Sequence, residues 1–190
     1  MKALEDKILK DGVILNNDIL KVDSFLNHQI DPEVIDALAL DMIEFFKDKK
    51  IDKVLTVETS GIVIAYAVAR VLKLPLVFAK KSKSATVGDD VYTTEIKSFT
   101  RNLVSKVTVS NKYIKKDENV LIVDDFLAEG NAAIGLIDIC NQANAKVVGF
   151  ATAIEKRFQG GRERIEAAGI KVYAGASIKS FENNKPVFER

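Results

Sequence analysis

Residues 120–132 read VLIVDDFLAEGNA, and no other part of the chain is as informative. The leading apolar residues predict a strand that is buried on both faces, as in parallel sheets. Asp124 and Asp125 end that strand, at the edge where open parallel sheets bind ligands, and adjacent residues there point to opposite sides. A turn of small residues then leads into a predicted helix over about residues 130–144. Free amides at a helix start, and the close approach that Gly130 allows, favour a bound phosphate.

Strands and helices alternate on both sides of this stretch. An Asp-Pro start and the apolar spacing of Ile35, Leu38, Met42 and Phe46 predict a helix from Asp31 to about Lys49. Further helices are expected at residues 1–12, 62–73 and 162–168, and further strands at 53–58, 74–80, 146–154 and 170–173. The alternation predicts an α/β fold with a parallel sheet. Residues 87–113 break the pattern and are more typical of a hairpin or a mobile flap over the sheet.

Composition limits the classes of protein that need to be considered. A chain of 190 residues with 47% hydrophobic residues suits one globular domain, and it has no apolar run long enough to span a membrane. The charged start has no signal-peptide core, so a cytoplasmic protein is the simplest interpretation. A single cysteine, Cys140, excludes an internal disulfide, and a single histidine, His28, excludes a multi-histidine metal site.

The net charge of +1 conceals a segregated distribution. Residues 80–116 hold nine basic and three acidic residues, so this segment carries +6 and the rest of the chain carries −5. A solvated basic face would explain the segment as well as a binding site for a polyanion would.

Taken together, these motifs resemble type I phosphoribosyltransferases, over most of the chain. Residues 120–132 resemble the motif of that family for phosphoribosyl pyrophosphate (PRPP). Glu58-Thr59-Ser60-Gly61 resembles its pyrophosphate loop, and Phe78-Ala79-Lys80-Lys81 ends a strand where the family has basic residues. Residues 155–162 are similar to its base-recognition hood, and the members that act on xanthine are the most similar.

The resemblance implies one domain over residues 1–190, with a parallel sheet flanked by helices. A flexible flap would span about 82–113, and a hood would be formed by about 1–30 and 156–190. The implied reaction moves 5-phosphoribose from PRPP to xanthine and releases pyrophosphate, with Mg²⁺ carried by PRPP and no metal ligand of its own in the protein. A cytoplasmic homodimer would be expected.

The resemblance also assigns roles to individual residues. Asp124 and Asp125 would hold the ribose hydroxyls as the catalytic acids. The 5′-phosphate would bind Ala128, Glu129, Gly130, Asn131 and Ala132, and pyrophosphate would bind Thr59, Ser60, Gly61, Lys80 and Lys81. The purine would contact Leu20, Asn27, Phe126 and Lys156. The Lys156 ammonium can only donate hydrogen bonds, so it favours an oxo-purine over adenine.

Three positions depart from the family pattern. Ala128 stands where hypoxanthine–guanine enzymes have an acid, which argues against that subclass, and Ala132 lacks a usual hydroxyl. Glu129 puts a carboxylate beside a phosphate site, so its side chain is expected to point away. A guanine or hypoxanthine enzyme and a PRPP-sensing nucleic-acid-binding regulator are the alternatives. Because the first motifs begin so early in these 190 residues, an N-terminal DNA-binding module is not expected.

Overall fold

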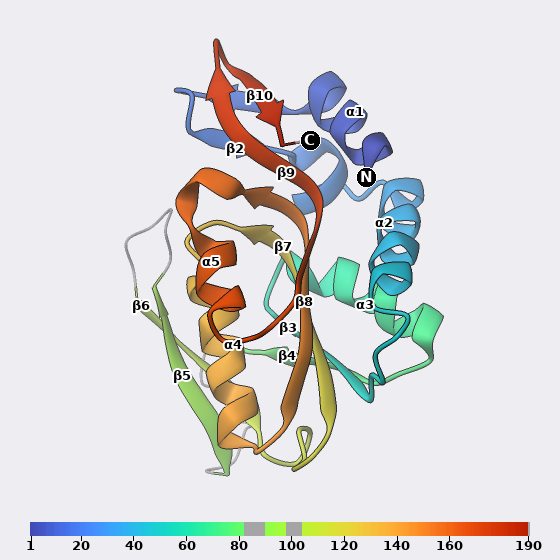
Figure 1. Cartoon of the computed structure of the whole chain (residues 1–190), viewed down its shortest axis with the longest axis vertical. Coiled ribbons are helices and arrows are strands. Elements are labelled where there is room, and N and C mark those ends of the chain that lie inside the picture. The colour runs from blue at the N-terminus through green and yellow to red at the C-terminus, as the bar shows by residue number, and fades with distance from the viewer. Residues whose placement is uncertain (82–89, 98–103, 190) are drawn as a thin grey trace.

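A six-stranded sheet forms the centre of the computed structural model, which describes residues 1–81, 90–97 and 104–189 (Figure 1). The strand order is β10-β9-β8-β7-β3-β4, and all neighbours are parallel except β9 and β10. Burial on both faces explains the continuous apolar runs of the central strands. The strands are β3 (Lys53–Val57), β4 (Leu76–Ala79), β7 (Asn119–Leu127), β8 (Lys146–Lys156), β9 (Val172–Glu182) and β10 (Lys185–Phe188).

Helices and a hairpin cover the two faces of this sheet. On one face α2 and α3 share an apolar core with the sheet, and this core includes Met42, Ile64 and Leu121. On the other face α4, α5 and the hairpin share a second core, which includes Leu136, Ile165 and Val107. The helices are α1 (Lys2–Asp11), α2 (Pro32–Phe45), α3 (Gly61–Leu72), α4 (Asn131–Gln142) and α5 (Gly161–Glu166). This arrangement confirms the predicted α/β class.

The N-terminal segment lies against the C-terminal end of the chain (Figure 1). It comprises α1, the strands β1 (Val13–Leu15) and β2 (Ile19–Lys21), and a short π-helical turn, Asp23–Asn27. The turns of the β1–β2 and β9–β10 hairpins exchange two hydrogen bonds. Asn17 N–H donates to Asn184 Oδ1 at 3.2 Å, and Asn184 N–H donates to Asn17 Oδ1 at 2.7 Å.

The basic segment contains an antiparallel hairpin of β5 (Val91–Lys97) and β6 (Val104–Ser110). Its β5 strand packs against α4, where Ile96 lies close to Gly135. A pair of backbone hydrogen bonds between Lys80 and Thr108 joins the hairpin to the end of β4. The hairpin prediction is confirmed for these strands, whereas residues 82–89 and 98–103 of the expected flap lie outside the described residues.

Several boundaries differ from the sequence predictions. Helix α2 ends at Phe45 rather than near Lys49, because the residues after Phe46 are charged and offer no apolar face to the sheet. Strand β9 runs to Glu182 instead of ending at Tyr173, and it turns back into β10 through Asn183 and Asn184. The sheet is therefore mixed at one edge. No helix among the described residues could cross a membrane.

Candidate active site

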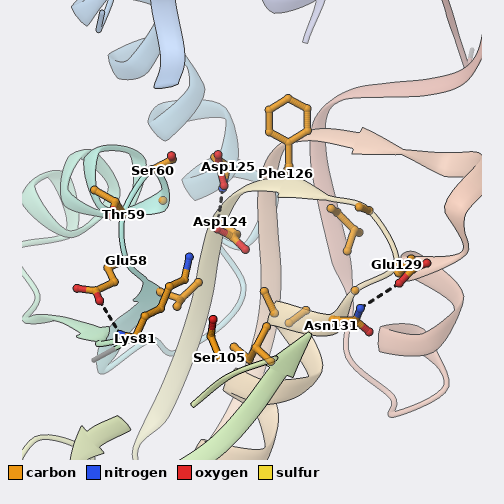
Figure 2. Close-up of a pocket in the computed structure, with 18 of the residues that line it drawn as sticks. Glu58, Thr59, Ser60, Lys81, Ser105, Asp124, Asp125, Phe126, Glu129 and Asn131 are labelled. Atoms are coloured by element: carbon orange, nitrogen blue, oxygen red, sulfur yellow. Dashed lines mark hydrogen bonds between the residues drawn. The ribbon is translucent and has the colours of Figure 1, made fainter. Parts of the chain in front are cut away.

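A cavity of about 600 Å³ opens at the carboxyl ends of β3 and β7, beside the starts of α3 and α4 (Figure 2). Both strands are parallel, so their carboxyl ends bring the two candidate loops to the same edge of the sheet. The lining residues are Val57, Glu58, Thr59, Ser60, Gly61, Lys81, Ile96, Ser105, Asp124, Asp125, Phe126, Leu127, Ala128, Glu129, Gly130, Asn131, Ala132, Ala133 and Phe150.

The two adjacent acids differ sharply in environment. Asp124 is only 5% exposed, whereas Asp125 is partly buried, and Figure 2 shows their side chains on opposite sides of the strand. The Asp125 N–H donates to Asp124 Oδ1 at 3.0 Å. Burial, reinforced by the nearby Asp125 charge, raises the pKa of Asp124 well above its usual range, and Lys81 partly opposes that rise. Asp124 is thus a poorly solvated carboxylate that faces a cavity.

Gly61 allows the first loop to approach the acids closely. A Cβ at this position would lie 2.4 Å from Thr56 Oγ1 and 2.9 Å from Asp124 Oδ1. No side chain fits at these distances, so only glycine lets α3 begin directly against Asp124. The first-turn amides of α3 therefore lie beside the acids, where a helix start favours an anion.

The second loop, residues 128–132, connects β7 to α4. Gly130 has a φ of +80°, in the left-handed region that glycine adopts without strain. Because α4 begins at Asn131, the amides of its first turn have no carbonyl four residues earlier in the helix. These residues line the cavity, so their amides and the helix dipole suit a phosphate group.

The carboxylate of Glu129 is turned away from the acids. Asn131 Nδ2 donates to Glu129 Oε2 at 3.0 Å, and Figure 2 shows this pair on the far side of the loop from Asp124. Arg164 of α5 reaches the same loop: its Nη1 donates to Asn131 Oδ1 at 2.8 Å and to the Glu129 carbonyl oxygen. Side-chain contacts, and not repulsion alone, thus hold Glu129 in place.

Gly161, the first residue of α5, packs closely against the backbone of the 128–132 loop. A Cβ on Gly161 would meet Ala128 O at 2.2 Å and Gly130 N at 2.8 Å. Sequence reasoning assigned residues 155–162, which include Gly160 and Gly161, to a base-recognition hood, and it missed Arg164 entirely. The double glycine was the available signal for a close backbone contact, but its partner lies about thirty residues earlier in the chain.

The two candidate lysines occupy different environments. Lys81 lines the cavity, its N–H donates to Glu58 Oε1 at 2.5 Å, and Figure 2 shows its ammonium reaching toward Asp124. Lys80 is not among the lining residues, and its backbone is paired with Thr108. Successive residues of an extended chain point to opposite sides, so these two neighbours do not face the same cavity.

The candidate purine contacts are only partly brought to this cavity. Phe126 lines it, with its ring directed away from Glu129 and Asn131 in Figure 2. Leu20, Asn27 and Lys156 do not line it. Leu20 belongs to the apolar core that the sheet shares with α2 and α3, and Phe126 packs against that core. Asn27 carries a buried Oδ1 without a hydrogen-bond partner among the described residues.

Lys156 lies at the end of β8, under the N-terminal segment. Its Nζ donates to Asp18 O at 2.7 Å and lies 5.8 Å from the centre of the Phe181 ring. Burial lowers its pKa. The side chain therefore connects the sheet to the β1–β2 and β9–β10 hairpins, which together form the hood-like end of the molecule.

Among known protein families, the phosphoribosyl transferase domain matches residues 21–183 of this chain. This chain belongs to the phosphoribosyltransferase family. It is 50% identical over 189 residues to the xanthine phosphoribosyltransferase of Finegoldia magna, with 100% of both chains covered. It is 47% identical to that of Leuconostoc mesenteroides, covering 99% of this chain and 100% of the other.

Solved structures of phosphoribosyltransferases share the fold. The enzyme from Giardia lamblia, complexed with 9-deazaadenine, has a TM-score of 0.76 at 20% identity, covering 90% of this chain and 95% of the other. Adenine phosphoribosyltransferase from Saccharomyces cerevisiae has a TM-score of 0.73 at 20% identity, covering 92% and 99%. These structures confirm the predicted fold, and the family match with the full-length relatives confirms the predicted enzyme class: the chain is a pentosyltransferase.

Proposed function

We propose that this phosphoribosyltransferase transfers 5-phosphoribose from PRPP to xanthine. The observation that carries the proposal is the cavity in which the 59–61 loop and the 128–132 loop face one another beside Asp124. Full-length relatives named xanthine phosphoribosyltransferase, at 47–50% identity, support xanthine as the purine.

The two loops would hold the two charged ends of PRPP. Residues 128–132 would bind the 5′-phosphate through backbone amides, and Thr59, Ser60 and Gly61 would bind pyrophosphate together with Lys81. Lys80 would contribute only to the positive potential, because its side chain is not on the cavity. Asp124 and Asp125 would hold the ribose hydroxyls between the two loops.

In the reaction, the bond from ribose C1′ to the pyrophosphate oxygen breaks while a purine ring nitrogen bonds to C1′. The nitrogen loses its proton, and the products are XMP and pyrophosphate. The chain's own contribution is positioning and stabilisation of charge. Lys81 and the amides would receive the leaving group, and the rim made by Ile96 and Ser105 of the β5–β6 hairpin would help to exclude water.

Mg²⁺ fits this cavity as a companion of PRPP. Carboxylate oxygens are suitable partners for Mg²⁺ and its waters, and two carboxylates end β7. Among the described residues no group of three or more histidines, cysteines or acids could hold a metal without substrate. When bound through PRPP, Mg²⁺ would neutralise pyrophosphate charge.

The purine would lie between Phe126 and the N-terminal segment. Lys156 would donate to an exocyclic oxygen, with Leu20 and Asn27 completing the hood over residues 1–30 and 156–190. The flap would span 82–113. The unpartnered Asn27 Oδ1 supports a polar ligand there, since buried acceptors are normally satisfied.

The chain would act in the cytoplasm as a homodimer. The buried free thiol of Cys140 suits a reducing compartment. Exposed apolar side chains on α2, α3 and β4 are candidates for the dimer surface, namely Leu40, Tyr66, Val71 and Phe78. Sedimentation of the purified protein measures whether it forms a dimer.

A purine panel with PRPP and Mg²⁺ tests the proposal. We expect xanthine to be the preferred substrate over guanine and hypoxanthine, with adenine the poorest. Lys156→Ala should lose the preference for oxo-purines, because an ammonium donates to oxygen and repels an amino group.

Other outcomes would identify a different function. Turnover of guanine or hypoxanthine without xanthine would assign the chain to the neighbouring subclass. Salt-sensitive nucleic-acid binding with no purine turnover would indicate a regulator. If Lys156→Ala keeps the wild-type selectivity, the assigned purine contact is wrong.

A further inference from the structure

The 128–132 loop combines an anion-binding backbone with a carboxylate. Glu129 is partly buried on a loop that would bind a phosphate, and a carboxylate repels a phosphate that binds beside it. Some part of the chain must therefore keep the carboxylate away from the phosphate while leaving the loop amides available.

Three hydrogen-bonded side chains, Arg164, Asn131 and Glu129, hold the carboxylate in this way. Arg164 carries only donors and a carboxylate is only an acceptor, so an amide placed between them can be oriented in one way alone. Asn131 has that orientation: its Oδ1 accepts from Arg164 Nη1 at 2.8 Å and its Nδ2 donates to Glu129 Oε2 at 3.0 Å. The positive charge on α5 thus sets the direction of the amide that restrains Glu129.

Arg164 also acts on the loop backbone. Its second hydrogen bond goes to the carbonyl oxygen of Glu129. The peptide between Glu129 and Gly130 is trans, so its C=O and N–H point in opposite directions. With the carbonyl directed at Arg164, the Gly130 N–H points away from the Arg164 guanidinium.

We propose that Arg164 is a positioning residue for the 5′-phosphate of PRPP, which holds the 128–132 loop open to the phosphate and the Glu129 carboxylate away from it. The proposal rests on the PRPP function above. It adds a residue that lies off the cavity lining and acts through Glu129 and Asn131.

Arg164→Ala tests the proposal. We expect KM for PRPP and Kd for ribose 5-phosphate to rise about tenfold, the scale of one lost charge-assisted hydrogen bond. The kcat value and the Kd for pyrophosphate should stay unchanged, because the 59–61 loop does not contact Arg164. Arg164→Lys should restore part of the lost affinity, since an ammonium can donate to one of the two acceptors.

Two further variants sharpen the test. Glu129→Gln removes the repelling charge, so Arg164→Ala should cost less affinity in that background than in the wild type. Arg70→Ala removes an exposed arginine of α3 that pairs with Asp36, and it should leave ribose 5-phosphate binding unchanged. Thermal unfolding of each variant checks that the fold is intact.

The outcomes separate this proposal from the one on which it rests. If the wild type binds neither PRPP nor ribose 5-phosphate, the PRPP function itself fails. If the wild type binds both and Arg164→Ala binds them equally well, or loses pyrophosphate to the same extent, the positioning role is overturned. Equal losses from Arg164→Ala in the wild type and in the Glu129→Gln variant would overturn the restraint on the carboxylate.

Discussion

At the scale of single residues, close backbone approach is the recurring device of this site. Gly61 brings the start of α3 against Asp124, and Gly161 brings the start of α5 against the 128–132 loop. Neither glycine needs a special φ. Each is required because another group occupies the space of a Cβ.

Gly161→Ala is expected to displace the 128–132 loop. The new Cβ would lie 2.2 Å from Ala128 O, and neither backbone can give way without moving the loop. We expect the free energy of unfolding to fall by about 1–3 kcal/mol, as for overpacked cores, and KM for PRPP to rise. Thermal denaturation and steady-state kinetics measure the two effects.

Gly160→Ala is the neighbouring comparison. Nothing lies within 4 Å of a Cβ at Gly160, but its φ of +75° strains an alanine. It should therefore lower stability while KM for PRPP changes less than in Gly161→Ala. Equal KM values in the two variants would contradict the role of close contact.

At the scale of elements, the two hairpins of the hood-like end are joined by Asn17 and Asn184. Both residues have a left-handed φ, of 51° and 56°, which asparagine tolerates better than most residues. The next residue after Asn17 is Asp18, whose carbonyl accepts from Lys156. The pairing of the hairpins thus sets the position of a candidate purine contact.

Asn184→Gly is expected to weaken purine binding selectively. Glycine accepts the backbone conformation, so the variant removes the Oδ1 acceptor without adding strain. We expect KM for xanthine to rise about three- to tenfold, the scale of one hydrogen bond, with KM for PRPP unchanged. Steady-state kinetics with each substrate varied in turn provides the measurement.

Asn183→Gly serves as the matched control. Asn183 has a φ of 51° in the same turn and no side-chain hydrogen bond within the part of the chain that the structure describes. Its KM values should match the wild type. A rise in KM for PRPP as large as that for xanthine in Asn184→Gly would show that the hairpins do more than position the purine.

At the scale of the whole molecule, stability and the candidate site are in conflict at Asp124. Its pKa is raised in the folded state by burial, so folding is favoured by this group below its ordinary pKa, near 3.8. That contribution is lost as the pH rises and the buried carboxyl must ionise. The site therefore lowers global stability at neutral pH.

Asp124→Asn is expected to raise the melting temperature and abolish transfer. The gain over the wild type should be larger at pH 8 than at pH 4, because the carboxyl ionises readily in the unfolded state above its ordinary pKa while burial resists its ionisation in the folded state. Thermal scans at both pH values measure the gain in melting temperature. Asp48→Asn, at an exposed position, is the control and should change neither the melting temperature nor the transfer activity. An equal gain at both pH values would contradict ionisation as the cause.

The sequence alone determined the α/β class, the helix starts and the 120–132 motif. These depend on local signals: apolar runs, an Asp-Pro cap and glycines at turns. It missed β10 and most of β9. Tyr173 lies in a strand with little continuous apolar character, although the asparagine pair at 183 and 184 was a usable turn signal.

Only the tertiary structure decided which candidates meet. It separated Lys80 from Lys81 and buried Asp124 more deeply than Asp125. It also brought Arg164 to a loop more than thirty residues earlier in the chain. The physical reason is that periodicity and caps act between neighbours along the chain, whereas burial, pKa and loop support arise where distant segments pack together.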